Sequence, residues 1–191
     1  MSKGLIAVDV DLTVVEMAQP WLDWLNGVCD DHITMHMLSK VYGDIPYALN
    51  QVAPFCSKLE GLHTSGMDFW RNQYLYDDKK PIEGSVEVLS KLNQEGYDIC
   101  FVSAITGNHQ SSKYHFLKRY FPFLKGVVLT REKFLVNCDY IIDDRINILN
   151  AMPEKTKCIQ YKTPFSQAED KARDVLVLDQ WGSLPELLKS L

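Results

Sequence analysis

The chain has 191 residues, of which 46% are hydrophobic and 24% charged, and its formal net charge is −5 at pH 7. This length suits one domain, or one core domain with a modest insertion, and it buries enough surface to fold without a disulfide or metal. The negative charge argues against a nucleic-acid partner, whose footprint usually appears as a basic excess. A small phosphorylated substrate is not excluded, because local lysines and a metal ion can reverse the field inside one cleft.

The cysteines and the amino-terminus indicate the compartment. The five cysteines are odd in number, widely spaced and without a C-x-x-C pair, so we expect free, buried thiols in a reducing compartment. Met1-Ser2-Lys3 leads into a short apolar run rather than a secretory signal, and no run approaches the roughly 20 apolar residues of a membrane span. We therefore predict a cytoplasmic protein without a membrane partner, and a homodimer is allowed.

Short apolar runs that alternate with helical patterns indicate the fold class. The runs typical of buried strands are residues 4–10, 97–103, 126–129, 140–142, 158–161 and 175–178. Helical spacing of apolar residues occurs at 86–92, 114–121 and 184–191. Strands that alternate with helices imply parallel pairing. We therefore predict an α/β fold with a Rossmann-like parallel sheet and helices on both faces.

Residues 16–79 break this alternation. They are rich in Trp, Met, Tyr and His, have mainly helical patterns and contain no convincing strand. The stretch is too long for a βα connection, which usually has about 2–6 residues. We predict a small helical cap inserted after the first strand, over the strand ends where open α/β sheets bind ligands. The predicted division is a core of residues 1–15 and 80–191 with a cap of residues 16–79.

Acidic and polar side chains fall where three of the predicted strands finish. Asp9 and Asp11 close the first strand, Ser103 closes the second, and Asp143 with Asp144 closes the fourth. Unpaired carboxylates at a buried strand end are costly unless a cation balances them, and Mg²⁺ prefers oxygen ligands. The alternative is that they are helix caps and turn residues, which Asp favours after a strand. The occurrence of two such pairs favours a metal site.

Four motifs in this order resemble those of the haloacid-dehalogenase-like phosphatases. They are Asp9-Val10-Asp11-Leu12-Thr13 (D-x-D-x-T), Ser103 at a strand end, Lys133, and Ile141-Ile142-Asp143-Asp144-Arg145. The runs LTREK and YIIDDR, which contain the third and fourth motifs, resemble the 5′(3′)-deoxyribonucleotidase branch in particular. The resemblance covers residues 1–15 and roughly 81–150 and is faint in the predicted cap. Leu12 departs from the family, which usually has Gly there, and this suggests a tighter turn after the first strand.

The resemblance implies an enzyme that hydrolyses phosphomonoesters with Mg²⁺ through an aspartyl-phosphate intermediate. Asp9 would be the nucleophile and a metal ligand. Asp11 would be the general acid and base, and its backbone carbonyl would be a second metal ligand. The resemblance favours Asp144 as the remaining ligand, with Asp143 beside it, although adjacency alone leaves the choice between the two open.

The same resemblance implies a phosphate site. Ser103, Ala104 and Lys133 would hold the phosphate, and Arg131 would either add charge near it or form a surface ion pair. Ala104 stands where the nucleotidases carry the second residue of their motif. This departure bears on substrate recognition more than on the chemistry.

Aromatic residues of the predicted cap are candidates for substrate contacts. Phe69, Trp70, Tyr74 and Tyr76 could stack on a nucleobase, or they could serve packing within the cap. Met17 falls where the deoxyribonucleotidases place an aromatic contact to the base, so we expect that contact to be replaced or lost. The expected substrate is a (deoxy)nucleoside monophosphate.

Several alternatives stay open at this point. The substrate could be a sugar phosphate or a 3′-phosphorylated nucleic-acid end, or the fold could be a non-catalytic phosphate-binding module. His32 and His36 could form a metal site on a helix face, although no H-E-x-x-H context accompanies them. Motifs for ATP and dinucleotide binding are absent from the sequence.

Overall fold

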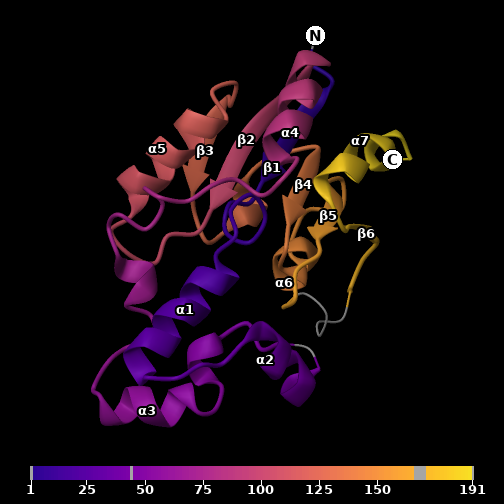
Figure 1. Ribbon diagram of the computed structural model, residues 1–191. Coiled ribbons are helices and arrows are strands. Elements are labelled where there is room, and N and C mark those ends of the chain that lie inside the picture. The colour runs from indigo at the N-terminus through magenta and orange to yellow at the C-terminus, as the bar shows by residue number, and fades with distance from the viewer. Residues whose placement is uncertain (1, 44, 166–170, 191) are drawn as a thin grey trace.

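The computed structural model describes residues 2–43, 45–165 and 171–190, and its centre is a parallel sheet (Figure 1). The six strands have the order β3-β2-β1-β4-β5-β6, and every neighbouring pair is parallel. They are β1 (Gly4–Val8), β2 (Tyr97–Ser103), β3 (Gly126–Leu129), β4 (Tyr140–Asp143), β5 (Lys157–Tyr161) and β6 (Val175–Leu178). All six predicted strands are confirmed, but the first ends at Val8, because the chain turns directly after it.

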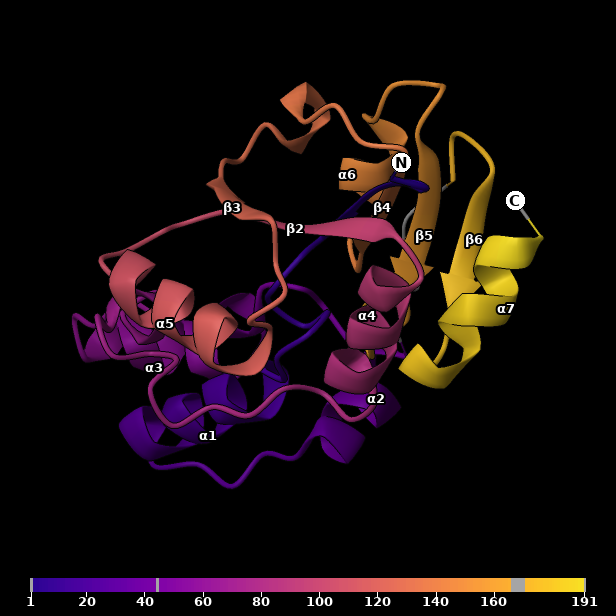
Figure 2. The same ribbon diagram turned by 90° about the horizontal axis from the view of Figure 1, so that it is seen from above.

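Helices cover both faces of the sheet. They are α4 (Ser85–Gln94), α5 (Gln110–Tyr120), α6 (Ile146–Asn150) and α7 (Leu184–Lys189). Helices α4, α5 and α7 lie on one face and α6 on the other (Figure 2). Strand alternation explains the two layers: Ile6 of β1 packs in one cluster with Leu89 of α4, whereas Ala7 packs in another with Ile146 of α6. The predicted α/β class is confirmed.

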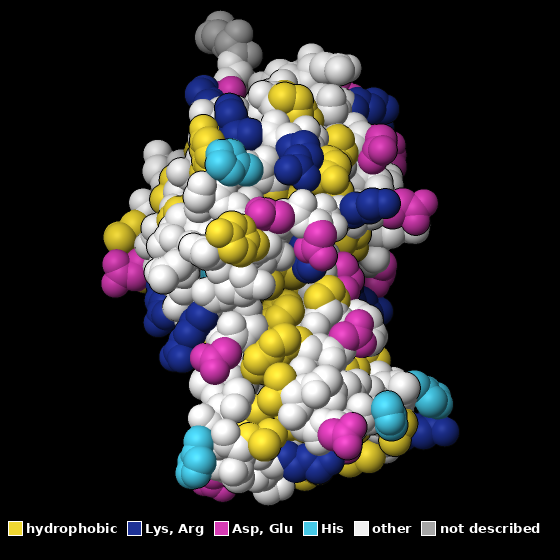
Figure 3. All heavy atoms as spheres, turned by 60° about the vertical axis from the view of Figure 1, so that its left-hand side comes forward, with side chains coloured by type: hydrophobic (Ala, Val, Ile, Leu, Met, Phe, Trp, Pro, Cys, Tyr) yellow, Lys and Arg dark blue, Asp and Glu magenta, His cyan; other side chains and the backbone are white. Residues whose placement is uncertain are grey.

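The segment of residues 16–79, called here the inserted helical segment, forms a separate lobe beyond the carboxyl ends of the strands (Figure 1). Its described residues contain no strand, and its helices are α1 (Ala18–Cys29), α2 (Met35–Tyr42) and α3 (Phe55–Gly61), with 3₁₀ turns at Leu49–Gln51 and Phe69–Arg71. The two ends of the segment leave and rejoin the rest of the chain side by side. The Ile82 N–H donates to the Val14 carbonyl at 2.8 Å, and Val15 pairs with Pro81. Figure 3 shows this lobe below a narrower waist, with a band of hydrophobic side chains running from the waist onto it.

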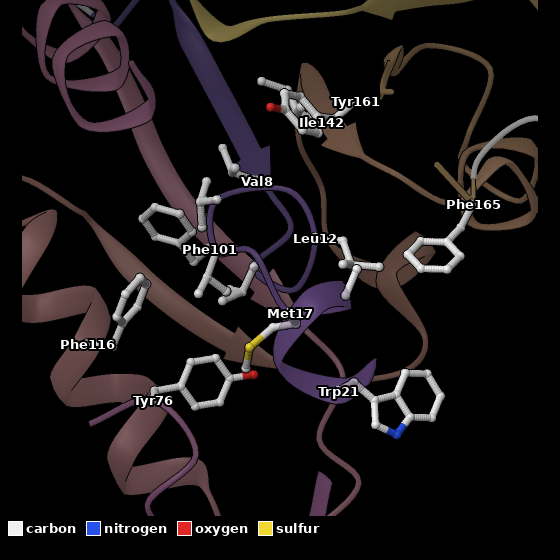
Figure 4. Close-up of a cluster of buried hydrophobic side chains, with 14 of the residues drawn as sticks. Val8, Leu12, Met17, Trp21, Tyr76, Phe101, Phe116, Ile142, Tyr161 and Phe165 are labelled. Carbon is white, nitrogen blue, oxygen red and sulfur yellow. The ribbon is translucent and has the colours of Figure 1, made fainter. Parts of the chain in front are cut away.

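One hydrophobic cluster continues from the sheet into the inserted helical segment. It runs from Val8 and Phe101 on the strands to Met17 and Trp21 at α1 (Figure 4). Each large apolar side chain that is fully buried contributes about 1.5–3 kcal/mol. The Trp21 Nε1–H also donates to the carbonyl of Gly66 at 3.1 Å, which ties the two ends of the segment together. The segment is therefore packed against the sheet and not merely tethered to it.

All five cysteines are free, and four of them are buried as expected, whereas Cys56 is exposed. Among the described residues, no helix combines the length and apolar character that crossing a membrane requires.

Candidate active site

The acidic and polar strand ends meet at one edge of the sheet. β1 lies between β2 and β4. The chain adds β2 and β3 on one side of β1 and then crosses over to add β4, β5 and β6 on the other side. Such a reversal creates a crevice at the carboxyl ends of the strands. Asp9 follows β1 directly, Ser103 ends β2 and Asp143 ends β4. The sheet order therefore brings together side chains that lie far apart in the sequence.

The turn after β1 places Asp11. The Val10 carbonyl accepts the N–H groups of Val14 at 3.0 Å and Val15 at 3.1 Å, which closes a tight loop. Leu12 has a φ of 64°, in the left-handed region. A non-glycine residue there costs roughly 1–2 kcal/mol, which explains why glycine suits this position. The chain therefore turns within a few residues of β1, with backbone strain at Leu12.

Lys133 joins two of the carboxylates. Its Nζ lies 2.6 Å from Asp9 Oδ1 and 2.6 Å from Asp143 Oδ2, and the side chain is buried. Burial alone would lower the pKa of Lys133, but Asp143 and Asp9 together raise it above its ordinary value. Burial raises the pKa of Asp9 to about 6, while Lys133 acts in the opposite direction. Lys133 therefore stays charged, yet it does not offset the full cost of burying the Asp9 carboxylate.

A third carboxylate completes a group that fits a metal ion. Asp9, Asp143 and Asp144 offer oxygen atoms that all lie within 4.8 Å of one another. Asp143 uses both of its oxygens, one on Lys133 and one accepting the Arg145 N–H at 3.0 Å. Oδ1 of Asp144 is buried and has no hydrogen-bond partner among the described residues, and burial with the charges of Asp143 and Asp9 raises the pKa of Asp144 well above its ordinary value. Such an all-oxygen set with a free buried oxygen fits a hard cation such as Mg²⁺.

The alternative histidine site is not formed. His36 lies on α2, whereas His32 lies in the loop before it, so the two do not share a helix face. Throughout the described part of the chain, the aspartate group is the only cluster of three or more His, Cys, Asp or Glu with ligand atoms near enough for one ion.

A second lysine, which the sequence analysis did not single out, lies beside Asp11. Lys113 Nζ is 2.7 Å from both Asp11 Oδ2 and Ser103 Oγ, and 3.2 Å from the carbonyl oxygen of Ala104. The side chain is fully buried on α5. The signal in the sequence was a lysine three residues before Phe116, where the helical pattern requires an apolar residue. A fully buried ammonium group is stable only where acceptors surround it, and it therefore marks the site.

Two tyrosines of the inserted helical segment donate to the site's carboxylates. The sequence does not point to Tyr47, and it indicates Tyr76 only as a residue for stacking or packing. The Tyr47 hydroxyl donates to Asp144 Oδ2, and the Arg145 guanidinium lies 4.6 Å from the centre of the Tyr47 ring. The Tyr76 hydroxyl donates to Asp11 Oδ1. Burial, followed by the charge of the bonded aspartate, raises the pKa of each tyrosine well above its ordinary value. Both phenols therefore remain donors at neutral pH.

A cavity of about 550 Å³ opens beside the aspartates. Its described lining residues are Asp9, Asp11, Leu12, Met17, Ala18, Trp21, Tyr47, Ala48, Asn50, Gln51, Met67, Trp70, Ala104, Thr106, Arg131, Lys133, Arg145, Ile148 and Phe165. Three of the predicted substrate contacts, Met17, Trp70 and Arg131, are among them. Phe69 is not among these described lining residues, because its ring packs against Trp21 and Trp70 from behind. The packing alternative therefore describes Phe69 better than a substrate contact does.

Solved structures define the class of fold. The chain is similar to a putative haloacid dehalogenase-like hydrolase from Burkholderia xenovorans, with a TM-score of 0.60 and 14% identity, covering 97% of this chain and 96% of that one. It is also similar to L-2-haloacid dehalogenase from Xanthobacter autotrophicus, with a TM-score of 0.57 and 10% identity, covering 100% of both chains. The fold is therefore that of the haloacid-dehalogenase-like hydrolases.

Sequence comparison gives the family within that class. The model of the family described as 5′ nucleotidase, deoxy (pyrimidine), cytosolic type C protein matches residues 4–188, and the chain belongs to this family. A 5′(3′)-deoxyribonucleotidase of Bacillus phage SPbeta is 27% identical over 176 residues, which cover 88% of this chain and 91% of the phage protein. The human mitochondrial 5′(3′)-deoxyribonucleotidase is 28% identical over 99 residues, and the match spans 49% of this chain and only 43% of the human protein.

Proposed function

We propose that the protein is a Mg²⁺-dependent phosphatase that hydrolyses (deoxy)nucleoside monophosphates through a phosphorylated Asp9. The observation that carries the proposal is the position of Asp9, whose carboxylate lies against Lys133 at the end of β1 and beside Asp143 and Asp144. A nucleophile, a fixed positive charge and a cation site are thus combined at one point, which phosphoryl transfer requires.

We choose the residues that would hold the metal by asking which carboxylate oxygens lack a hydrogen-bond partner among the described residues. Asp9 and Asp144 would bind Mg²⁺ directly, together with the backbone carbonyl of Asp11, because Asp143 already uses both of its oxygens on Lys133 and the Arg145 N–H. When bound, the ion would neutralise charge on the phosphate and on the carboxylates. Asp143 would then orient Lys133 and the loop after β4.

The first chemical step transfers the phosphoryl group to the protein. An oxygen of the Asp9 carboxylate attacks phosphorus, and the bond between phosphorus and the ester oxygen breaks. The proton of the Asp11 carboxyl group passes to the leaving oxygen, so that the alcohol departs neutral. Lys133 and Lys113, with the hydroxyl of Ser103, stabilise the negative charge of the phosphoryl oxygens.

The second step releases inorganic phosphate. Asp11, now a carboxylate, accepts a proton from water, whose oxygen attacks phosphorus. The bond between phosphorus and Asp9 breaks, and the Asp9 carboxylate and the Asp11 carboxyl group are restored. One acidic residue thus serves both steps, first as acid and then as base.

The lining of the cavity supports a nucleotide substrate. A volume of about 550 Å³ suits a ligand of that size. Arg131 and Lys133 line the cavity beside Asp9 and would hold the phosphate, and the rings of Trp21 and Trp70 offer apolar surface for a planar base. A sugar phosphate has no comparable apolar surface, so this wall favours the nucleotide over the sugar.

The inserted helical segment, residues 16–79, would act as the cap over a core of residues 1–15 and 80–191. Its tyrosines and tryptophans reach the site from above the strand ends, which is why we assign substrate selection to it. A homodimer and a cytoplasmic location remain predictions from the sequence.

The proposal is tested by phosphate release from a panel of 5′- and 3′-(deoxy)nucleoside monophosphates, sugar phosphates and 4-nitrophenyl phosphate. We expect turnover that requires Mg²⁺, that is fastest on a nucleotide and that Asp9→Asn abolishes, because no other side chain occupies the position of the nucleophile. Turnover by Asp9→Asn above about one per cent of the parent rate would contradict the nucleophile assignment, since removing such a group typically costs several orders of magnitude. Mg²⁺ binding without turnover on any substrate would instead indicate a binding module.

A further inference from the structure

The buried side chain of Tyr76 is hydrogen-bonded to Asp11 as well as packed in the core. Its side chain is 0% exposed, and its hydroxyl donates to Asp11 Oδ1. Lys113 Nζ occupies the other carboxylate oxygen, Oδ2, at 2.7 Å. Each oxygen of Asp11 therefore has a donor with a fixed position, and these two contacts together set the plane of the carboxylate.

The tyrosine is itself held in place by α5. Its backbone N–H donates to Ser112 Oγ at 2.9 Å. Its ring centre lies 5.4 Å from that of His109 and 5.9 Å from that of Phe116, and Lys113 Nζ lies 5.1 Å from the ring centre. The helix that carries Lys113 thus also fixes Tyr76, so both donors to Asp11 are positioned by one rigid element.

A hydroxyl at this depth is unfavourable unless it is bonded, and phenylalanine would fill the same space without that cost. Packing therefore accounts for the ring of Tyr76 but not for its oxygen. Within the described part of the chain, its hydrogen-bond partner is the carboxylate to which we assign proton transfer.

We propose that Tyr76 is a positioning residue for proton transfer by Asp11, an inference that rests on the proposed function. By holding Oδ1, it restricts the carboxyl group to one orientation toward the leaving oxygen. We assign Tyr76 a contact with Asp11 and not with the substrate, because its ring is enclosed by His109, Lys113 and Phe116 and its hydroxyl is bonded to the carboxylate. It belongs to the stretch between the 3₁₀ turn at Phe69–Arg71 and α4, so the inserted helical segment supplies part of the acid and base machinery.

The test uses two substrates that need a proton to different degrees. A nucleoside 5′-monophosphate has an alkoxide leaving group, which must be protonated as it departs, whereas 4-nitrophenyl phosphate releases a stable phenolate. The ratio kcat/KM reports the steps up to formation of the phosphoenzyme and release of the alcohol or phenol. We expect Tyr76→Phe to lower kcat/KM for the nucleotide by at least about tenfold and to leave that for 4-nitrophenyl phosphate within about threefold.

The matched control is Tyr74→Phe, because Tyr74 is 63% exposed and lies two positions away. We expect it to match the parent protein on both substrates. A second variant, Ser112→Ala, keeps the hydroxyl of Tyr76 but removes the oxygen that accepts the Tyr76 backbone N–H. It should lower kcat/KM for the nucleotide more than for 4-nitrophenyl phosphate, by a smaller ratio than Tyr76→Phe does. The melting temperature of each variant is measured on the same preparation that is used for its kinetics.

The outcomes separate this inference from the proposed function. If the parent protein hydrolyses neither substrate, or if Asp9→Asn retains activity on both, the proposed function fails. Suppose instead that the parent is active and Asp9→Asn is inactive. If Tyr76→Phe and Ser112→Ala then lose kcat/KM equally on the two substrates, Tyr76 serves packing alone. If Tyr76→Phe loses kcat/KM on neither substrate, the positioning role is also overturned.

Discussion

At the scale of single residues, the site is a balance of buried charges. Lys133 and Lys113 each contact two polar groups at 2.6–2.7 Å, and neither side chain is appreciably exposed. Burying such groups is favourable only while every partner is present. Loss of either lysine should therefore reduce stability as well as activity.

Lys133→Met tests this balance. We expect the free energy of unfolding, measured by urea denaturation without Mg²⁺, to fall by about 3 kcal/mol, because Asp9 and Asp143 lose their shared cation. Added Mg²⁺ should restore part of the loss. The matched control is Lys162→Met, whose ion pair with Asp179 is exposed and should contribute less than about 1 kcal/mol. Similar small losses in both variants would show that the buried pairs are not held as described.

At the scale of elements, the site depends on close contact between the loop after β2 and the inserted helical segment. A Cβ atom built on Gly107 would lie 2.6 Å from the Trp70 carbonyl oxygen and 2.6 Å from Arg71 Cα, both of which are backbone atoms. Trp70 lines the cavity, and its backbone packs closely against this glycine in the loop that follows Ser103. The absence of a side chain at Gly107 thus allows the segment to lie against the loop that follows Ser103.

Gly107→Ala should displace Trp70 and raise KM for the nucleotide more than it lowers kcat. Overpacking of this kind costs about 1–3 kcal/mol of stability. Gly27→Ala is the control, since a Cβ at Gly27 in α1 would meet nothing within 4 Å and should stabilise the helix by up to about 1 kcal/mol. Steady-state kinetics with thermal melts measure both effects, and an unchanged KM in Gly107→Ala would contradict the contact.

The sequence predicts the strands of the fold better than it predicts the contacts within the site. The six strands and the carboxylates at their ends were predictable, because strand patterns and motif spacing are local signals. Lys113 and the hydroxyls of Tyr47 and Tyr76 were not assigned, because their partners lie far away in the sequence and only the packing of α5 and the inserted helical segment brings them together. Our proposal of Asp144 over Asp143 as the direct ligand likewise uses hydrogen bonds to both oxygens of Asp143, which the sequence does not reveal.

At the scale of the whole molecule, we expect the aspartate group to couple stability to pH and, through the proposed metal site, to Mg²⁺. Burial raises the pKa of Asp9 from 3.8 to about 6, and the pKa of Asp144 is raised in the same direction. A carboxyl group with a raised folded-state pKa binds more protons when folded. Without metal, its contribution to stability therefore falls as pH rises from about 4 through 6, by roughly 3 kcal/mol for Asp9.

Mg²⁺ should reverse this loss, because it takes the place of the protons. We expect the rise in melting temperature on adding Mg²⁺, relative to a chelator, to be larger at pH 7.5 than at pH 5. Asp144→Asn should abolish most of that rise, because it removes a carboxylate with a free buried oxygen. A Mg²⁺ effect that is equal at the two pH values, or that Asp144→Asn does not change, would place the ion elsewhere.

The proposed function depends on a covalent bond between Asp9 and phosphorus, and mass spectrometry can detect that bond directly. The protein is mixed with Mg²⁺ and the best nucleotide from the panel, quenched in acid within one turnover, digested and analysed. We predict that the peptide containing Asp9 gains the mass of one phosphoryl group, that fragmentation places the group on Asp9, and that Asp9→Asn shows no gain. Turnover without any phosphorylated peptide, or a phosphoryl group on another residue, would contradict the central claim.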